Sequence, residues 1–328
     1  MNSNNHPLLS IILPICNVEK YVAKCLDSIL ISTFRNFELL VYNDCSPDAS
    51  LTICQNYAQQ DSRIKILNSL SKGGGSKGPS FGRNAALKEA IGEYVTFADG
   101  DDWVSPIMYQ TMVDAMIKYD SDIVICGHNI VYPDRIERNS KVSESIIYNR
   151  IEATRLILQD EKILSFAWDK MYKRSLWDGI EYPVGRIYED TATTFKLFHK
   201  ANRVIHIPNC LYYYRRNNES ICLSPNKASV LKRGYDNFLA FYERYRFVEE
   251  HSDYQDILDL CAFKAYMMGR NAITVDVMYN DSANVDGLKN KFLGIRHLSL
   301  PMQEKIRRFL ITHFFSLYKC MVWIRYKL

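Results

Sequence analysis

Three aspartates stand within four residues of the chain, at Asp99, Asp101 and Asp102, directly after the apolar run 94–97. Carboxylates this close repel one another, so ionising all three is costly unless a cation lies between them. Oxygen ligands of this kind suit Mg²⁺ or Mn²⁺, and such ions commonly bridge to the phosphates of a substrate. The alternative is an acidic turn, because aspartate is a preferred N-cap of helices. The spacing alone leaves both interpretations open.

A second pair of carboxylates, Glu189 and Asp190, directly precedes the helical pattern 191–201. A reaction that activates a hydroxyl needs a general base, and a carboxylate commonly fills that role. The N-terminus of a helix would help to keep such a carboxylate ionised. Plain helix capping is the alternative interpretation of this pair.

The segments around these carboxylates alternate between strand patterns and helix patterns. Short apolar runs predict buried strands, and apolar residues at every third or fourth position predict helices. The expected strands are 8–14, 37–42, 64–67 and 94–97, and the expected helices are 18–31, 49–59 and 81–90. This alternation predicts βαβ units and an α/β fold with a mostly parallel central sheet.

Polar residues follow three of the expected strands. They are Cys16–Asn17, Asn43–Asp44 and the acidic triplet at 99–102. Ligands of parallel sheets bind beyond the carboxyl ends of the strands, so this topology brings the three groups to one edge. Their convergence favours a ligand site over an isolated acidic turn.

The pattern changes along the rest of the chain. Between about 105 and 225, helix patterns at 106–119 and 191–201 mix with strand patterns at 122–126, 204–207 and 211–214. From about residue 226 onward the pattern is mostly helical. We therefore expect a first domain over residues 1–225 and a helical C-terminal region over residues 226–328.

The order of these motifs resembles that of the family 2 glycosyltransferases, which are inverting, nucleotide-sugar-dependent enzymes with the Rossmann-like GT-A fold. The matching segments are 10–19, 38–48, 82–87, 99–102, 168–172, 188–191 and 212–221. Together they span roughly residues 8–222. Cys16, Asn43 and Cys45 depart from the family pattern, which has a tyrosine, an aspartate and a glycine there.

The resemblance implies a UDP-sugar donor held together with Mn²⁺ or Mg²⁺. Asp101 is expected to bind the metal directly, Asp99 to contact the metal or the ribose, and Asp102 to support them. Asp44 is suited to accept the N3–H of uracil. The other residues expected to bind the donor are Pro14, Asn17, Glu19, Arg83 and Lys170.

The same resemblance implies that Asp190 is the general base and that Glu189 orients acceptor or donor hydroxyls. Alternatives remain for the basic residues: Arg83 would otherwise form a surface salt bridge, and Lys170 a structural ion pair. Trp168 is expected to pack in the core rather than to serve as a platform for a sugar.

The implied reaction is transfer of a sugar to a hydroxyl of a glycan or lipid-linked oligosaccharide, such as a capsule or O-antigen precursor of a bacterial surface. Inversion of an α-linked donor would give a β-linkage. The alternatives are a nucleotidyltransferase, a glycan hydrolase and a catalytically degenerate nucleotide-binding scaffold. A hydrolase would also use two carboxylates, but it needs no nucleotide.

Composition narrows the classes of protein to consider. The chain has 328 residues, 47% of them hydrophobic, and a net charge of only +4, which does not indicate a nucleic-acid partner. Nine scattered cysteines without a CxxC pair favour reduced thiols in a cytoplasmic protein. The N-terminus has no signal-peptide pattern, and no apolar run reaches the roughly 18 residues of a transmembrane helix.

The positive charge is concentrated in residues 302–328, which hold six lysines and arginines against one acid, Glu304. Apolar residues there recur at helical spacing, and Trp323 lies near the end. This pattern predicts an interfacial helix that attaches the protein peripherally to an anionic membrane at the cytoplasmic face. The alternatives are a helix that packs on the catalytic domain and one that packs on a second copy in a homodimer.

Overall fold

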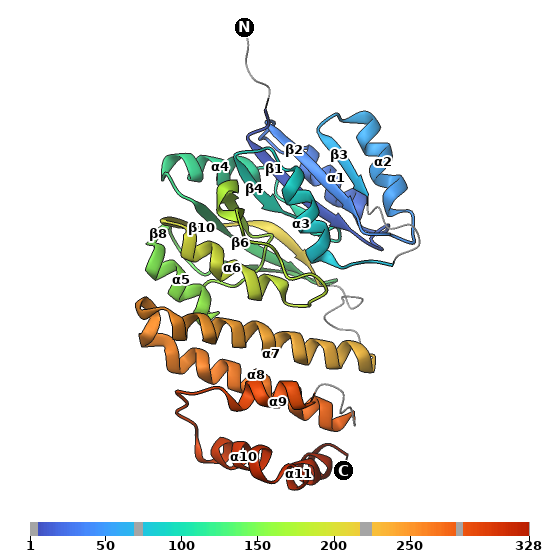
Figure 1. Ribbon diagram of the computed structural model, residues 1–328. Helices are drawn as coiled ribbons and strands as arrows, with labels where there is room; N and C mark the ends of the chain where they lie inside the picture. The colour runs from blue at the N-terminus through green and yellow to red at the C-terminus, as the bar shows by residue number, and fades with distance from the viewer. Residues whose placement is uncertain (1–5, 69–74, 217–224, 280–284, 328) are drawn as a thin grey trace. The chain divides into compact units, whose positions relative to one another are not determined.

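The protein is divided into two compact units, residues 1–217 and 218–328. The computed structural model describes residues 6–68, 75–216, 225–279 and 285–327 (Figure 1). The expected domain boundary at 225–226 stays a prediction, because the residues just before it lie outside the described part of the chain.

The first half of the N-terminal unit has the predicted alternation of strands and helices. Its strands are β1 (Leu9–Ile15), β2 (Phe37–Asn43), β3 (Ile64–Asn68) and β4 (Tyr94–Phe97), and its helices are α1 (Val22–Leu30), α2 (Ser50–Gln60) and α3 (Pro79–Glu89). The four strands are parallel, in the order β3-β2-β1-β4. Their carboxyl ends therefore lie along one edge, as the sequence predicts.

The second half of this unit extends the sheet with strands of both directions. Its strands are β5 (Trp103–Val104), β6 (Ile123–Val131), β7 (Ile136–Asn139), β8 (Ile146–Asn149), β9 (Lys170–Lys173) and β10 (Arg203–Arg215), and its helices are α4 (Met108–Lys118), α5 (Arg150–Gln159), the 3₁₀ turn η1 (Arg174–Trp177) and α6 (Glu189–Lys200). Strand β9 is antiparallel between β4 and β6. The ten-stranded sheet is thus mixed, and the α/β prediction is confirmed.

Two features of the sequence explain where the strand predictions differ from the structure. Strand β9 has only four residues with lysine at both ends, so it lacks an apolar run. The two strands expected at 204–207 and 211–214 are one strand, β10, whose register shifts between His206 and Cys210. Pro208 lies at that irregularity, and proline has no N–H for a ladder of hydrogen bonds.

Close packing brings helix α3 onto the sheet beside the expected site. The helix packs on β1 and β2. A Cβ atom at Gly82 would lie 2.8 Å from the ring of Tyr42, so only glycine permits this approach without a shift. Residues 83 and 84, which follow on the same helix, are thereby held near the carboxyl ends of β1 and β2.

The C-terminal unit is helical, as predicted. It contains α7 (Lys227–Glu250), the 3₁₀ segment η3 (Ser252–Ile257), α8 (Leu258–Met278), α9 (Val285–Leu293), α10 (Met302–His313) and α11 (Phe315–Lys327). Helices α7 and α8 run side by side (Figure 1). The prediction of a single helix over 302–328 is wrong. The structure has two helices, α10 and α11, which are separated at Phe314, where φ is −136°. None of the helices in the described ranges is long and apolar enough to span a bilayer.

Two buried histidines make the stability of the fold sensitive to acid. Burial, with the nearby Lys170 ammonium, lowers the pKa of His128 and of His206 from 6.5 to about 4. Both rings are therefore neutral in the folded protein at a pH where the unfolded chain already takes up protons. Below about pH 6.5 the unfolded state binds more protons, so the free energy of unfolding decreases as the pH falls.

We predict a loss of up to about 1.4 kcal/mol per pH unit for each histidine between about pH 6 and pH 4.5. Denaturant unfolding at a series of pH values measures this slope. A His206→Gln variant should flatten the slope by up to about 1.4 kcal/mol per pH unit, because it removes the contribution of one histidine. An unchanged slope in that variant would contradict the prediction.

Candidate active site

Strand β10 fixes the loop that carries the acidic triplet. The Tyr212 hydroxyl accepts the N–H of Asp99 at 3.1 Å and donates to Oδ2 of Asp102 at 2.9 Å. Arg215 donates its N–H to Oδ1 of Asp102 at 2.7 Å and its Nε–H to the Asp101 carbonyl at 2.9 Å. Both carboxylate oxygens of the buried Asp102 thus accept a hydrogen bond, so this residue supports the loop.

The carboxylate of Asp101 has a different environment. Burial and the charge of Asp99 raise the pKa of Asp101 from 3.8 to about 6. Within the described part of the chain, no other residue is seen to donate a hydrogen bond to this carboxylate. The charged form is therefore poorly stabilised, and a nearby cation would remove that penalty.

The two carboxylates Asp99 and Asp101 fit a divalent cation that binds together with its substrate. Oδ1 of Asp99 is already paired with Arg83, at 3.0 Å from Nη2. The described residues contain no group of three or more Asp, Glu, His or Cys side chains able to hold a metal ion. Mg²⁺ and similar ions often take one or two carboxylates and complete their shell with water and substrate phosphates. Asp99 and Asp101 would supply only part of such a coordination shell, and water and substrate phosphates would supply the rest.

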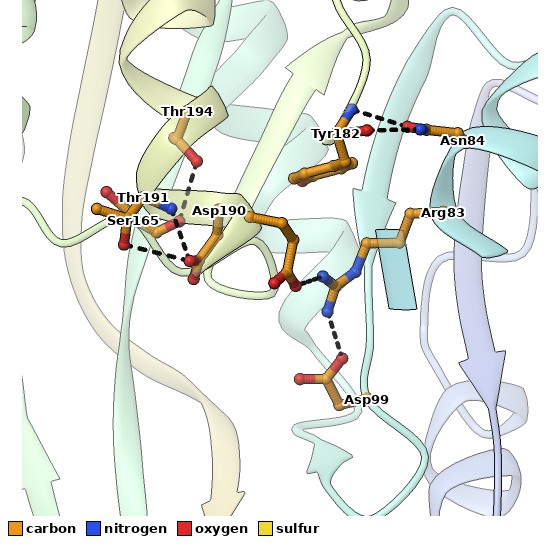
Figure 2. A network of polar contacts seen from close by, with 9 residues as sticks. Arg83, Asn84, Asp99, Ser165, Tyr182, Asp190, Thr191 and Thr194 are labelled. Atoms are coloured by element: carbon orange, nitrogen blue, oxygen red, sulfur yellow. Dashed lines mark hydrogen bonds and ion pairs between the residues drawn. The ribbon is translucent and has the colours of Figure 1, made fainter. Parts of the chain in front are cut away.

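Arg83 lies between the acidic triplet and helix α6 (Figure 2). Its guanidinium forms ion pairs with Asp99 and with Oε1 of Glu189, and it lies over the Tyr182 ring at 5.5 Å. Burial by itself lowers the pKa of Arg83, but Asp99 and Glu189 raise it above its ordinary value. The side chain is buried, so this pair is not the surface salt bridge considered above. Arg83 joins the loop after β4 to the start of α6.

The next residue, Asn84, holds the segment that leads into α6. Its Nδ2–H donates to the Tyr182 carbonyl at 2.8 Å, and its Oδ1 accepts the Tyr182 N–H at 2.9 Å (Figure 2). This paired contact is buried. Two successive residues of α3 therefore hold Glu189 and the segment that precedes it.

The two carboxylates at the start of α6 differ in what surrounds them. Tyr188 precedes the helix with φ 61°, in the left-handed region. Glu189 is buried and paired with Arg83, whereas the half-buried Asp190 accepts the N–H of Thr191 at 2.6 Å. Glu189 is thus held in place by a cation, and Asp190 lies at the positive end of the helix dipole.

Asp44 follows β2 and is enclosed by the loop before α3. Its Oδ2 accepts the Ser76 hydroxyl at 2.5 Å and the Gly78 N–H at 2.7 Å, and its Oδ1 accepts the Lys77 N–H at 2.9 Å. One lone pair of Oδ1 remains for a further donor. The next residue, Cys45, has φ 54°, in the left-handed region that ordinarily favours glycine.

The loop after β1 is joined to the loop after β2. The N–H of Asn17, which has φ 55°, donates to the Ser46 hydroxyl at 3.1 Å. Oε2 of Glu19 accepts the N–H of Ala49 at 2.9 Å, where helix α2 begins. Glu19 therefore fastens two loops together. Pro14 lies near the carboxyl end of β1, just before the first of these loops, and is half-buried.

Lys170 is buried completely. Its ammonium donates to the carbonyls of Leu164 at 2.6 Å and Phe166 at 2.8 Å, and to Oδ1 of Asp169 at 2.6 Å. An ammonium has three N–H donors, and all three are used here. The structure therefore places Lys170 in the structural ion pair that the sequence left open, and gives it no path to a diphosphate.

A stack of aromatic rings packs against Tyr212 and so supports its contacts with the acidic loop. The Trp168 ring stacks on Phe166 at 4.7 Å and on Tyr212 at 4.4 Å between centroids. Trp168 is buried, which matches the expectation of core packing. The sequence does not predict that Tyr212 binds Asp99 and Asp102. Its only signal is the place of Tyr212 in the tyrosine run 212–214.

We predict that Tyr212→Phe lowers stability by about 1–3 kcal/mol, because it leaves a buried oxygen of Asp102 and the N–H of Asp99 without a partner. The ring and its stacking are preserved, so packing is not the variable. Tyr213→Phe, one residue along the same strand, is the matched control. Denaturant unfolding of both variants tests this, and equal stability of the two would contradict it.

The sequence matches known proteins over most of its length. Residues 10–177 match the family model described as Glycosyl transferase family 2. The chain is 32% identical over 251 residues to the uncharacterized glycosyltransferase EpsJ of Bacillus subtilis, with 73% of this chain and 71% of EpsJ covered. It is 27% identical over 233 residues to the putative teichuronic acid biosynthesis glycosyltransferase TuaG of B. subtilis, with 70% and 87% covered.

A solved structure shares the fold. The crystal structure of S. aureus TarS 1-349 in complex with UDP-GlcNAc matches with a TM-score of 0.60 and 19% identity. The match covers 87% of this chain and 90% of that one. The fold of TarS and of this chain is therefore the same GT-A fold.

Proposed function

The chain belongs to glycosyltransferase family 2, and we propose that it transfers a sugar from a UDP-sugar to a hydroxyl of a glycan or lipid-linked acceptor. The observation that carries the proposal is the bridge of Arg83 between Asp99 and Glu189. It connects the loop suited to a metal and a diphosphate with the helix start suited to activating a hydroxyl. A transferase needs these two functions side by side.

Two observations support a uridine-containing donor. TarS, which has the same fold, is known in complex with UDP-GlcNAc. In this chain, the remaining lone pair on Oδ1 of Asp44 is suited to the N3–H of uracil, at the edge of the sheet where β1, β2 and β4 end. We propose Pro14 and Asn17 as neighbours of the base, and structural roles for Glu19 and Lys170.

Asp101 and Asp99 are the residues that we propose to hold Mn²⁺ or Mg²⁺. A divalent cation bound there would neutralise charge on the departing diphosphate as a Lewis acid. The raised pKa of Asp101 supports this assignment, because burial and Asp99 disfavour its charged form in the absence of a cation. Asp102 acts through the loop that it supports.

In the proposed reaction, Asp190 accepts the proton of the acceptor hydroxyl. The hydroxyl oxygen forms a bond to the anomeric carbon while the bond from that carbon to the diphosphate oxygen breaks on the opposite face. UDP leaves, and the configuration inverts, so an α-linked donor gives a β-linked product. Glu189, held by Arg83, orients hydroxyls and stays unavailable as the base.

We propose a precursor of a bacterial surface glycan as the acceptor, since the name of TuaG connects that relative to teichuronic acid. An acceptor linked to lipid lies in a membrane. We therefore propose that residues 302–328 attach the enzyme peripherally at the cytoplasmic face. A homodimer is the other arrangement that this segment would permit.

The test is a panel of UDP-sugars with Mn²⁺, read both as turnover and as protection against thermal unfolding. We predict that Asp190→Asn lowers kcat by about 10²- to 10⁴-fold, as expected for loss of a general base, and keeps the protection by UDP with Mn²⁺. Asp101→Asn should lose the contribution of Mn²⁺ to that protection. Asp134→Asn, at an exposed turn, is the matched control.

Other outcomes would overturn parts of the proposal. Normal turnover by Asp190→Asn would place the base elsewhere, and protection by GDP equal to that by UDP would exclude uracil recognition by Asp44. Release of sugar from a glycan without any nucleotide would indicate a hydrolase. Binding of UDP without turnover of any donor would indicate a scaffold.

A further inference from the structure

A cavity of about 330 Å³ lies inside the C-terminal unit, between helices α8, α10 and α11. Three arginines line it, one from each helix, and the rest of its wall comes from uncharged polar and apolar residues of α8 and α11. These arginines are Arg270, Arg307 and Arg325. No acidic side chain is among the lining residues, so the cavity suits an anion that carries an apolar portion.

One buried carboxylate, Glu304, forms ion pairs with two of these arginines. It pairs with Arg270 at 2.6 Å and with Arg307, and it accepts the Tyr266 hydroxyl at 3.1 Å. Two guanidinium groups thus share one carboxylate, which leaves this part of the cavity wall with an excess of positive charge. The planar fork of arginine matches the oxygens of a phosphate group.

The outer faces of α10 and α11 are apolar. On α10, Met302, Ile306 and Phe309 recur at helical spacing and are at least half exposed. On α11, Leu317 is exposed to 57% and Ile324 to 65%. A helix on a protein surface ordinarily turns its polar residues to water, and a contiguous apolar face indicates an interaction surface.

Exposed basic residues lie on the same faces. Lys305 lies three residues after Met302 and next to Ile306, on the same face of α10. Arg325 belongs to both features, because it lines the cavity and is exposed beside Ile324. Apolar side chains mixed with cations are what an anionic lipid surface attracts. A second copy of this chain fits less well, since it would bring two positive faces together.

We propose that the C-terminal unit docks on an anionic bilayer, with the outer faces of α10 and α11 in the headgroup region and a lipid phosphate in the arginine-lined cavity. This deepens the membrane attachment proposed above by naming the site and its ligand. The measurement does not depend on sugar transfer, so its failure and the failure of the proposed reaction are distinguishable.

The test is co-sedimentation of the full chain with vesicles of phosphatidylcholine alone or mixed with phosphatidylglycerol. We predict binding to the mixed vesicles that weakens with added salt, and little binding to the neutral ones. Ile324→Ser/Arg325→Gln should weaken binding by at least about tenfold, since one charge near an anionic surface alone contributes about fivefold.

The matched control is Ile117→Ser/Lys118→Gln, which changes an adjacent exposed pair at the end of α4 in the other unit. Ile117 is exposed to 62%, much as Ile324 is. Equal losses in the two double variants, or equal binding to neutral and mixed vesicles, would overturn the proposal. So would a concentration-dependent dimer that only the Ile324→Ser/Arg325→Gln variant loses, because it would assign the face to a second copy.

The cavity is tested separately with a short-chain phosphatidylglycerol that stays monomeric in solution. Protection against thermal unfolding by this lipid, lost in Arg325→Gln and kept in Lys118→Gln, supports a site for the headgroup. Equal protection by inorganic phosphate would identify a site for free phosphate and overturn the assignment to lipid.

Discussion

The arrangement of the site depends on one buried cation, the guanidinium of Arg83, held between the carboxylates of Asp99 and Glu189. A buried charge is tolerated only when it is paired, and removing one partner leaves an uncompensated charge that costs several kcal/mol. Helix α3, the loop after β4 and the start of α6 are consequently fixed relative to one another. The bridge thereby sets the distance between the carboxylates suited to a metal and those suited to a hydroxyl.

Carboxylates of the same chemical type have separate tasks here because their surroundings differ. Asp102 accepts hydrogen bonds from Tyr212 and Arg215, and Glu19 accepts one from the start of α2. Asp101 is half-buried beside a like charge, and no other described residue donates a hydrogen bond to its carboxylate, so it is the one that a cation would stabilise most. In the proposed reaction these carboxylates serve the diphosphate and the hydroxyl that every such transfer shares, so they do not select a particular sugar.

The strands β1–β4 and the acidic triplet could be predicted from sequence, because each is marked by its own residues in a continuous stretch. The roles of Tyr212 and Lys170 could not. Tyr212 contacts a loop that lies 110 residues earlier in the chain. Lys170 contacts only near neighbours, Asp169 and the carbonyls of Leu164 and Phe166, but nothing in the sequence shows that these acceptors gather around a buried ammonium. A lysine within a family motif is indistinguishable in sequence from one that binds phosphate, and only its burial among three acceptors decides. The break at Phe314 was missed for a related reason, since apolar spacing continues through it and carries no information about a change in helix direction.

The central claim, that one guanidinium couples the two carboxylates, is tested most directly by a double-mutant cycle of Asp99→Ala and Glu189→Gln in the free energy of unfolding. Each single variant leaves Arg83 one ionised partner, whereas the double variant leaves it none. The account predicts that the double variant loses more than the sum of the single losses, by at least about 1 kcal/mol, and that this excess vanishes in an Arg83→Met background. Losses that add within about 0.5 kcal/mol would contradict it.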